Sequence, residues 1–134
     1  MGTLDALMDL FFGREQALPE WLLRQHPELA DMRLRRGGLP LCVGGWALGR
    51  SSVAAITLWR TVFVANRVSL DAALLLHELR HVHQFQTSAT FPLQYLWESV
   101  RHGYHRNRFE ADARDFAASR LAARSAPDSM RGQA

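Results

Sequence analysis

The stretch His77-Glu78-Leu79-Arg80-His81 matches H-E-x-x-H and lies within a run of residues with helical spacing. Two histidines four positions apart project from one face of a helix, about 40° apart at 100° per residue. This spacing lets two imidazoles bind one Zn²⁺ ion, and the glutamate beside the first histidine can reach a water on that ion. The stretch therefore predicts a zinc hydrolase, with a peptidase as the first expectation.

The residues around the motif predict a buried helix over residues 70–86. Ser69 is a suitable N-cap, and Asp71 suits the positive end of the helix. The first half, Ala72–Leu76, is apolar on all sides. A helix of this kind is expected at the centre of a fold.

Strand signals precede this helix, and helical signals flank both. Residues 41–66 predict a β-hairpin, in which the apolar stretch Leu41–Leu48 forms one arm and the β-branched run Val53–Ala65 forms the other. Residues 3–36 predict short helices, the last of which turns Leu29 and Met32 inward. The sequence thus predicts an α+β fold, mostly helical, with a small hairpin or sheet packed beside the H-E-x-x-H helix.

Two further helices are predicted after the motif. The first covers Phe91–Arg101, with Leu93, Leu96, Trp97 and Val100 facing the core. The second covers residues 108–123. Residues 1–124 are expected to form a single domain, and the polar segment 125–134 is expected to be a disordered tail.

Composition restricts the possible partners. The chain has 134 residues and a formal net charge of +3, and all 16 basic residues are arginines. Apart from Arg33, Arg35 and Arg36 they are dispersed, so nucleic acid is an unlikely partner. No apolar run approaches the ~20 residues that span a bilayer, and no signal peptide is evident. We therefore expect a cytoplasmic protein without a transmembrane segment.

The single cysteine, Cys42, excludes an internal disulfide and a four-cysteine zinc site. It lies between Leu41 and Val43, so it is expected to be a small buried hydrophobic residue. Any zinc site must therefore be built from histidines and carboxylates.

A catalytic zinc ion needs a third protein ligand. The downstream candidates are His102, His105, Glu110, Asp112 and Asp115. Glu110 is preferred because it begins a helix that can pack across the H-E-x-x-H helix. Asp112 leaves the face of Glu110 by about 200°, so it is a poor direct ligand, although it could act through a histidine.

The motifs as a group resemble a known family. A strand at Ile56–Val64, H-E-L-R-H-V-H-Q at residues 77–84 and N-R-F-E-A-D-A at residues 107–113 look like the short bacterial HExxH domains of the gluzincin, or thermolysin-like, clan. The resemblance covers roughly residues 53–118, and its first motif is the more specific one. It implies a zincin-like minimal domain. In such a domain, His77, His81 and Glu110 would hold zinc and Glu78 would be the general base.

Other polar residues near the motifs allow several roles. Tyr104 and His105 precede the third ligand, and either could donate to a developing oxyanion, as Tyr or His does in many gluzincins. Gln84 shares the face of His77 and could support a ligand or make a hydrogen bond in the core. Tyr95 and Trp97 are expected in the core.

The leading expectation is a zinc-dependent peptidase that hydrolyses a peptide bond of a peptide or protein substrate. In this mechanism Glu78 takes a proton from a zinc-bound water during attack on the carbonyl. The alternative is a non-catalytic binding or structural module stabilised by zinc. The sequence leaves the substrate and the oligomeric state open.

Overall fold

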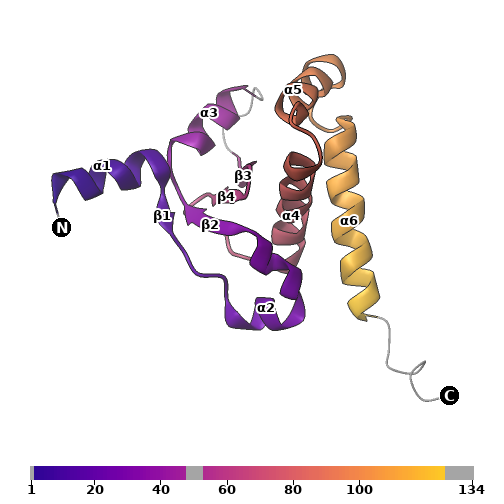
Figure 1. The fold of residues 1–134 in the computed structure, drawn as a ribbon, viewed down its shortest axis with the longest axis horizontal. Helices are drawn as coiled ribbons and strands as arrows, with labels where there is room; N and C mark the ends of the chain where they lie inside the picture. Colours follow the sequence, from indigo (N-terminus) through magenta and orange to yellow (C-terminus); the bar gives the residue numbers. More distant parts are fainter. Residues whose placement is uncertain (1, 48–52, 126–134) are drawn as a thin grey trace.

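The computed structural model describes residues 2–47 and 53–125. The predicted α+β fold is confirmed, because helices predominate and the four strands form one small mixed sheet (Figure 1). In chain order the elements are α1 (Thr3–Phe12), β1 (Arg14–Glu15), α2 (Glu20–Gln25), the 3-10 helix η1 (Pro27–Asp31), β2 (Arg33–Arg36), α3 (Leu39–Ala47), β3 (Ala55–Leu58), β4 (Thr61–Val64), α4 (Ala72–Thr87), α5 (Phe91–His102) and α6 (Arg108–Ser125).

The sheet has the strand order β1-β2-β4-β3. β2 runs parallel to β4, whereas the β1–β2 and β3–β4 pairs are antiparallel. β3 lies at one edge, where it contacts α4. The predicted single strand at Val53–Ala65 is wrong, because the chain reverses at Trp59-Arg60 and forms a hairpin by itself. Trp59 adopts a φ of 54° in this turn, and its ring packs against Phe85.

The last short helix predicted within residues 3–36 is also wrong, although Leu29 and Met32 are buried as expected. The chain forms η1 and then enters the sheet as β2, where Leu34 is buried and pairs with Val62. Arg36 donates through Nη1 to the carbonyls of Ala65 and Val68, 2.9 and 2.6 Å away. Parallel pairing with β4 and this hydrogen bonding outweigh the helical spacing of a short segment.

The predicted first arm of the hairpin, Leu41–Leu48, is a helix where the structure describes it. This helix, α3, extends from Leu39 to Ala47, and Gly44 lies against β3. A Cβ atom at Gly44 would lie 2.5 Å from Cδ1 of Ile56, so a larger residue here would displace the end of the Ile56 side chain. Cys42 is exposed rather than buried, because α3 turns it away from the sheet. Leu48 and the predicted turn at residues 49–52 lie outside the described residues.

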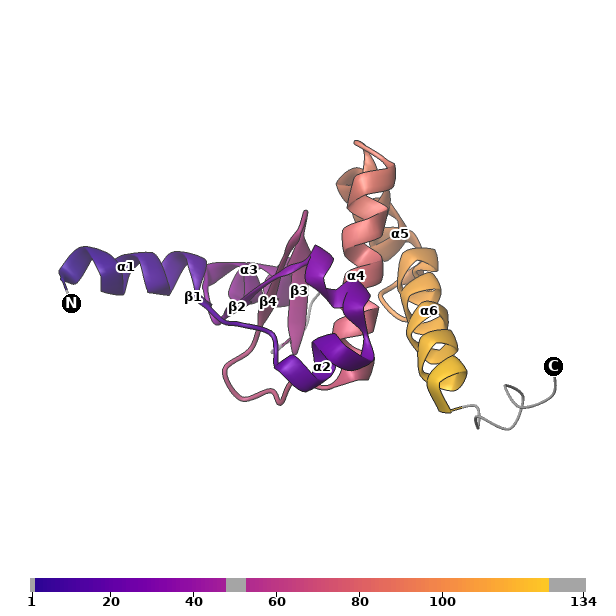
Figure 2. The same ribbon diagram turned by 60° about the horizontal axis from the view of Figure 1, so that its bottom comes forward.

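The H-E-x-x-H helix is found close to its predicted position, as α4. Asp71 rather than Ser69 caps it, because the Asp71 carboxylate accepts from the backbone N–H of Leu74 at 2.7 Å. α4 lies between the sheet and α6 (Figures 1 and 2). Its four fully buried apolar residues are at the centre of the core: Leu75, Leu76, Leu79 and Val82.

Helix α5 buries a different face from the one predicted. The residues expected in the core are all exposed: Leu93 (70%), Leu96 (51%), Trp97 (61%) and Val100 (76%). The inward side instead carries Phe91, whose ring packs edge-on against Phe85 and Phe109. These aromatic contacts with α4 and α6 determine which side of α5 is buried.

Helix α6 extends from Arg108 to Ser125, two residues beyond the predicted end. It packs along α4 through the small buried residues Ala113 and Ala117. The remainder of the predicted tail lies outside the described residues. Within residues 2–47 and 53–125, no helix is both long and apolar enough to cross a membrane.

Candidate metal centre

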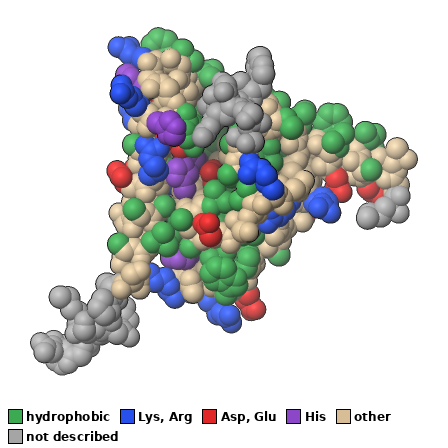
Figure 3. Space-filling view, turned by 180° about the vertical axis from the view of Figure 1, so that it is seen from behind, with side chains coloured by type: hydrophobic (Ala, Val, Ile, Leu, Met, Phe, Trp, Pro, Cys, Tyr) green, Lys and Arg blue, Asp and Glu red, His purple; other side chains and the backbone are tan. Residues whose placement is uncertain are grey.

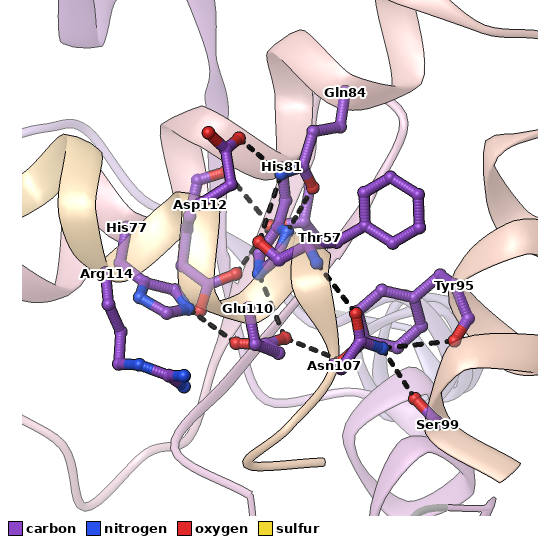
Figure 4. A network of polar contacts seen from close by, with 12 residues as sticks. Thr57, His77, His81, Gln84, Tyr95, Ser99, Asn107, Glu110, Asp112 and Arg114 are labelled. Carbon is purple, nitrogen blue, oxygen red and sulfur yellow. Dashed lines mark hydrogen bonds and ion pairs between the residues drawn. The ribbon is translucent and has the colours of Figure 1, made fainter. Parts of the chain in front are cut away.

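Three predicted metal ligands meet between α4 and α6 (Figure 4). His77 and His81 project from α4, and Glu110 projects from the first turn of α6. The Nε2 atom of His77 is 2.9 Å from Oε2 of Glu110, and the Nε2 atom of His81 is 3.1 Å from Oε1. One ligand atom from each residue lies within 4.8 Å of the others, so the three can bind a single ion.

The donor set and its spacing fit a divalent metal. Tetrahedral zinc has bonds of about 2.0–2.1 Å, which places neighbouring ligand atoms about 3.3 Å apart. The two Nε2–carboxylate distances of 2.9 and 3.1 Å are close to this separation. Two imidazoles and one carboxylate are also ligands that zinc accepts in catalytic sites, where a fourth position stays open.

Glu110 and His81 each shift the pKa of the other. Burial opposes ionisation of Glu110, but hydrogen bonds from His77 and His81 outweigh it and lower the pKa of that carboxyl. Burial also opposes protonation of His81, yet the hydrogen bond to Glu110 and the negative charges of Glu78 and Glu110 raise its pKa to about 9. The site therefore concentrates negative charge where a cation would be bound.

Tyr95 joins this centre from α5, although its aromatic character predicted a core position. Its hydroxyl donates to Oε1 of Glu110 at 2.6 Å, and its ring packs edge-on against His81. Burial, together with the negative charge of Glu110, raises the pKa of the Tyr95 phenol, so it remains a hydrogen-bond donor. The position of Tyr95 one turn after Phe91 is the sequence signal that could have placed both residues on one inward face.

A chain of hydrogen bonds behind His81 fixes the orientation of its ring. Gln84 donates through Nε2 to the Phe109 carbonyl and to Asp112, so its Oε1 faces His81 and accepts from Nδ1 at 2.8 Å. The hydrogen bond places a proton on Nδ1 and directs Nε2 toward Glu110. Arg80 in turn holds Asp112 through a 2.7 Å ion pair, and its hydrogen bond lowers the pKa of the Asp112 carboxyl. Asp112 thus acts on His81 through Gln84, as a supporting residue rather than a ligand.

Glu78 lies beside the ligands with its carboxylate inside the fold. Its side chain is 6% exposed, and Oε2 accepts a hydrogen bond from the Thr57 hydroxyl at 2.6 Å. Thr57 lies on β3, which brings the edge of the sheet into the site. This contact was not predicted from the sequence. A buried polar residue in an otherwise apolar strand is the only signal for it.

A cleft of about 280 Å³ opens between β3, α4 and α5, and Glu78, His81 and Glu110 lie along it. The remaining lining is mainly apolar and aromatic: Val53, Ala55, Ile56, Leu58, Phe85, Phe91, Pro92, Tyr95, Leu96 and Tyr104. Figure 3 shows histidine and acidic side chains close together on one face, with hydrophobic side chains next to them. A mainly apolar cleft with a few converging polar groups is typical of a ligand site.

The remaining candidates differ in their relation to the cleft. Tyr104 lines it, whereas His105 is exposed and packs edge-on against the Tyr104 ring. The His105 carbonyl accepts a 2.9 Å hydrogen bond from Arg114. His102 and Asp115 are exposed and do not join the ligand cluster.

Asn107 positions the start of α6 and has a structural role that the sequence did not predict. Its side chain is fully buried and donates to the Tyr95 carbonyl and to the Ser99 hydroxyl. Its Oδ1 accepts from the backbone N–H of Phe109 at 2.9 Å, which caps the new helix. Asn107 therefore connects the end of α5 to the turn of α6 that carries Glu110.

Every buried side-chain nitrogen or oxygen within the described ranges has a hydrogen-bond partner, so the centre is a complete polar network. Comparisons of the chain with protein-family models, with curated proteins and with solved structures gave no match.

Proposed function

We propose that this protein is a zinc-dependent peptidase. The observation that carries the proposal is the convergence of His77, His81 and Glu110, the last two of which line a cleft together with the buried Glu78 carboxylate. A buried carboxylate in this position, held by a hydrogen bond from Thr57, has little purpose in a purely structural core, whereas a general base requires it.

Zinc bound by these ligands would lower the pKa of a water molecule toward ~7 and polarise a substrate carbonyl. Glu78 accepts the proton of the attacking water and returns it to the leaving amine. Thr57 holds Oε2 of Glu78, which leaves Oε1 for this proton transfer. Tyr95 and Gln84 keep Glu110 and His81 in fixed orientations during these steps.

The cleft supports an extended peptide as the substrate. β3 is an edge strand, and its Ala54–Ala65 hydrogen bond implies that the backbone groups of Ala55 and Thr57 point to the free edge. A peptide could pair with this edge while apolar side chains fill the cleft. An Ala55→Pro substitution tests the pairing, because it removes an outward N–H without breaking the β3–β4 ladder. Unchanged peptide cleavage in this variant would exclude the pairing.

The peptidase proposal is tested by measuring zinc content and cleavage of an unfolded protein for wild type, Glu78→Gln and His81→Ala. We expect Glu78→Gln to keep zinc and lose cleavage, and His81→Ala to lose both. Glu15→Gln, an exposed glutamate on β1, is the matched control and should resemble wild type. Cleavage by Glu78→Gln at the wild-type rate would overturn the proposal.

A second candidate is a non-catalytic module stabilised by zinc. It is favoured by one observation: hydrogen bonds from His77, His81 and Tyr95 connect α4 and α5 to a single carboxylate on α6. A metal in this place would link three helices. The same experiment separates the two, because this module predicts zinc binding, unfolding of His81→Ala and no cleavage by any variant.

A further inference from the structure

Helix α1 exposes its entire apolar face. None of its ten residues is buried, and Leu4, Leu7, Met8 and Phe11 are 46–71% exposed. The helix projects away from the body of the molecule, with α3 as its neighbour (Figures 1 and 2). A helix this short is marginal in water unless an apolar face packs against something. We therefore expect these four residues, here called the α1 stripe, to pack against another apolar surface.

Helix α5 exposes a second apolar face with the same residue spacing. Leu93, Leu96, Trp97 and Val100, here called the α5 stripe, are 51–76% exposed. Both stripes follow the spacing i, i+3, i+4, i+7, which places four side chains on one face of a helix. They are therefore matched in length and in number of side chains, as two packed helices require.

The charges beside the two stripes are opposite in sign. α1 carries Asp5 and Asp9 and has no basic residue. In Figure 3 the projecting arm shows hydrophobic side chains along one side and acidic ones along the other. Beside the α5 stripe lie Arg101 and the guanidinium of Arg108, which contacts Gln94. The single acid of α5, Glu98, is paired with Arg108, so this flank keeps a net positive charge.

The positions of these charges favour antiparallel packing. On a helical wheel, Asp5 and Asp9 lie about 100–140° from Leu4, and Gln94, Glu98 and Arg101 lie about 80–140° from Leu93 in the same rotational sense. Each stripe has one row of polar residues on either side. When two helices pack antiparallel through their stripes, the rows that lie in the same rotational sense from each stripe face each other. With Leu4 opposite Val100, Asp5 in the first turn of α1 meets Arg101 near the end of α5.

The α1 stripe and the α5 stripe of one chain are held apart. Arg35 donates to the carbonyls of Phe12 and Gly13, 2.6 and 3.1 Å away, and so fixes the direction in which α1 leaves the sheet. That direction is away from α5 (Figure 2). We propose that α1 of one copy packs antiparallel on the α5 stripe of a second copy. Leu96 also lines the cleft, so the incoming helix would form part of the rim of the candidate site.

Two variants with one altered stripe each provide the test. Leu7→Gln/Phe11→Gln disables the α1 stripe, and Trp97→Gln/Val100→Gln disables the α5 stripe. Trp21→Gln on α2, where Trp21 is 47% exposed, is the matched control outside both stripes. Mass is measured by sedimentation equilibrium over a range of protein concentrations, and circular dichroism checks that each variant is folded.

Wild type and Trp21→Gln should self-associate, and each double variant should be monomeric by itself. A mixture of the two double variants should form a 1:1 complex, because one intact α1 stripe and one intact α5 stripe remain. A monomeric wild type would overturn the proposal, including the case in which it binds anionic lipid vesicles instead. Self-association of either double variant alone, or no complex in the mixture, would equally overturn it.

Discussion

Replacing Thr57 by valine removes a hydroxyl whose contacts are both with Glu78, a short one to its carboxylate and a 3.4 Å one to its backbone carbonyl. The two side chains have nearly the same shape, and Thr57 is 7% exposed. Its hydroxyl donates to Oε2 of Glu78 at 2.6 Å, a short distance typical of a hydrogen bond to an ionised group. The substitution therefore leaves a buried carboxylate without its donor from β3.

A hydrogen bond to a charged group contributes about 1.5–3 kcal/mol. We expect the free energy of unfolding of Thr57→Val to fall by about this amount. If Glu78 is the general base, losing its fixed orientation should also slow the reaction. Since about 1.4 kcal/mol corresponds to a factor of ten, kcat should fall by roughly ten- to one-hundred-fold. The zinc content should stay at the wild-type level, because Thr57 is not among the ligands.

Urea denaturation, metal analysis and a cleavage assay measure these three effects. Thr61→Val is the matched control, because Thr61 lies on β4 and its hydroxyl makes no hydrogen bond in the part of the chain that the structure describes. Thr57→Ser should recover most of the kcat, since it restores the hydroxyl. The reasoning is refuted if Thr57→Val and Thr61→Val are equal in both unfolding free energy and kcat.

Three further predictions concern the metal and the core. Gln84→Leu removes the acceptor that orients His81, so zinc affinity measured by chelator competition should fall about 10–100-fold; an unchanged affinity would contradict this role. Zinc affinity should rise from pH 6 to pH 8. The pKa of His81 without metal is about 9, so zinc must displace a proton from its ring, and that displacement becomes easier as the pH rises. A zinc affinity that calorimetry finds independent of pH would contradict this coupling. Leu79→Ala should lower the free energy of unfolding by about 2–5 kcal/mol, because Leu79 is fully buried. Leu39→Ala, on the exposed side of α3, should change it by less than about 0.5 kcal/mol. Equal losses for the two variants in urea denaturation would contradict the packing of Leu79.

The parts of the fold that could be predicted from the sequence have strong local signals. α4 combines a capping residue, an apolar first half and two histidines at helical spacing, so its position was predicted to within two residues at its start. Glu110 could be predicted as a neighbour of the histidines because it lies in the first turn of a helix that packs across α4. These signals lie within short segments of the chain, so they can be read from neighbouring residues alone.

The incorrect predictions concern segments whose structure depends on distant residues. Arg33–Arg36 has little intrinsic preference for a strand and becomes one by pairing with β4, about thirty residues later in the chain. Gly44 lies in the stretch predicted as the first arm of the hairpin, whereas it belongs to a helix and leaves room there for the Ile56 side chain. The apolar residues of α5 predicted an inward face, but Phe91 and Tyr95 occupy that face instead. Thr57 could not be assigned to Glu78 without knowing that β3 is an edge strand beside α4.

The buried alanines of α6 affect the size of the opening between the three candidate ligands. Ala113 and Ala117 let α6 approach α4 closely, and the separation of two packed helices depends on the side chains between them. Glu110 is on one helix and both histidines are on the other, so this separation also sets the size of the opening between the three ligands. A larger residue at position 113 would widen that opening without touching any ligand. If this group holds an ion, we expect two methyl groups that do not contact it to influence which ionic radius fits.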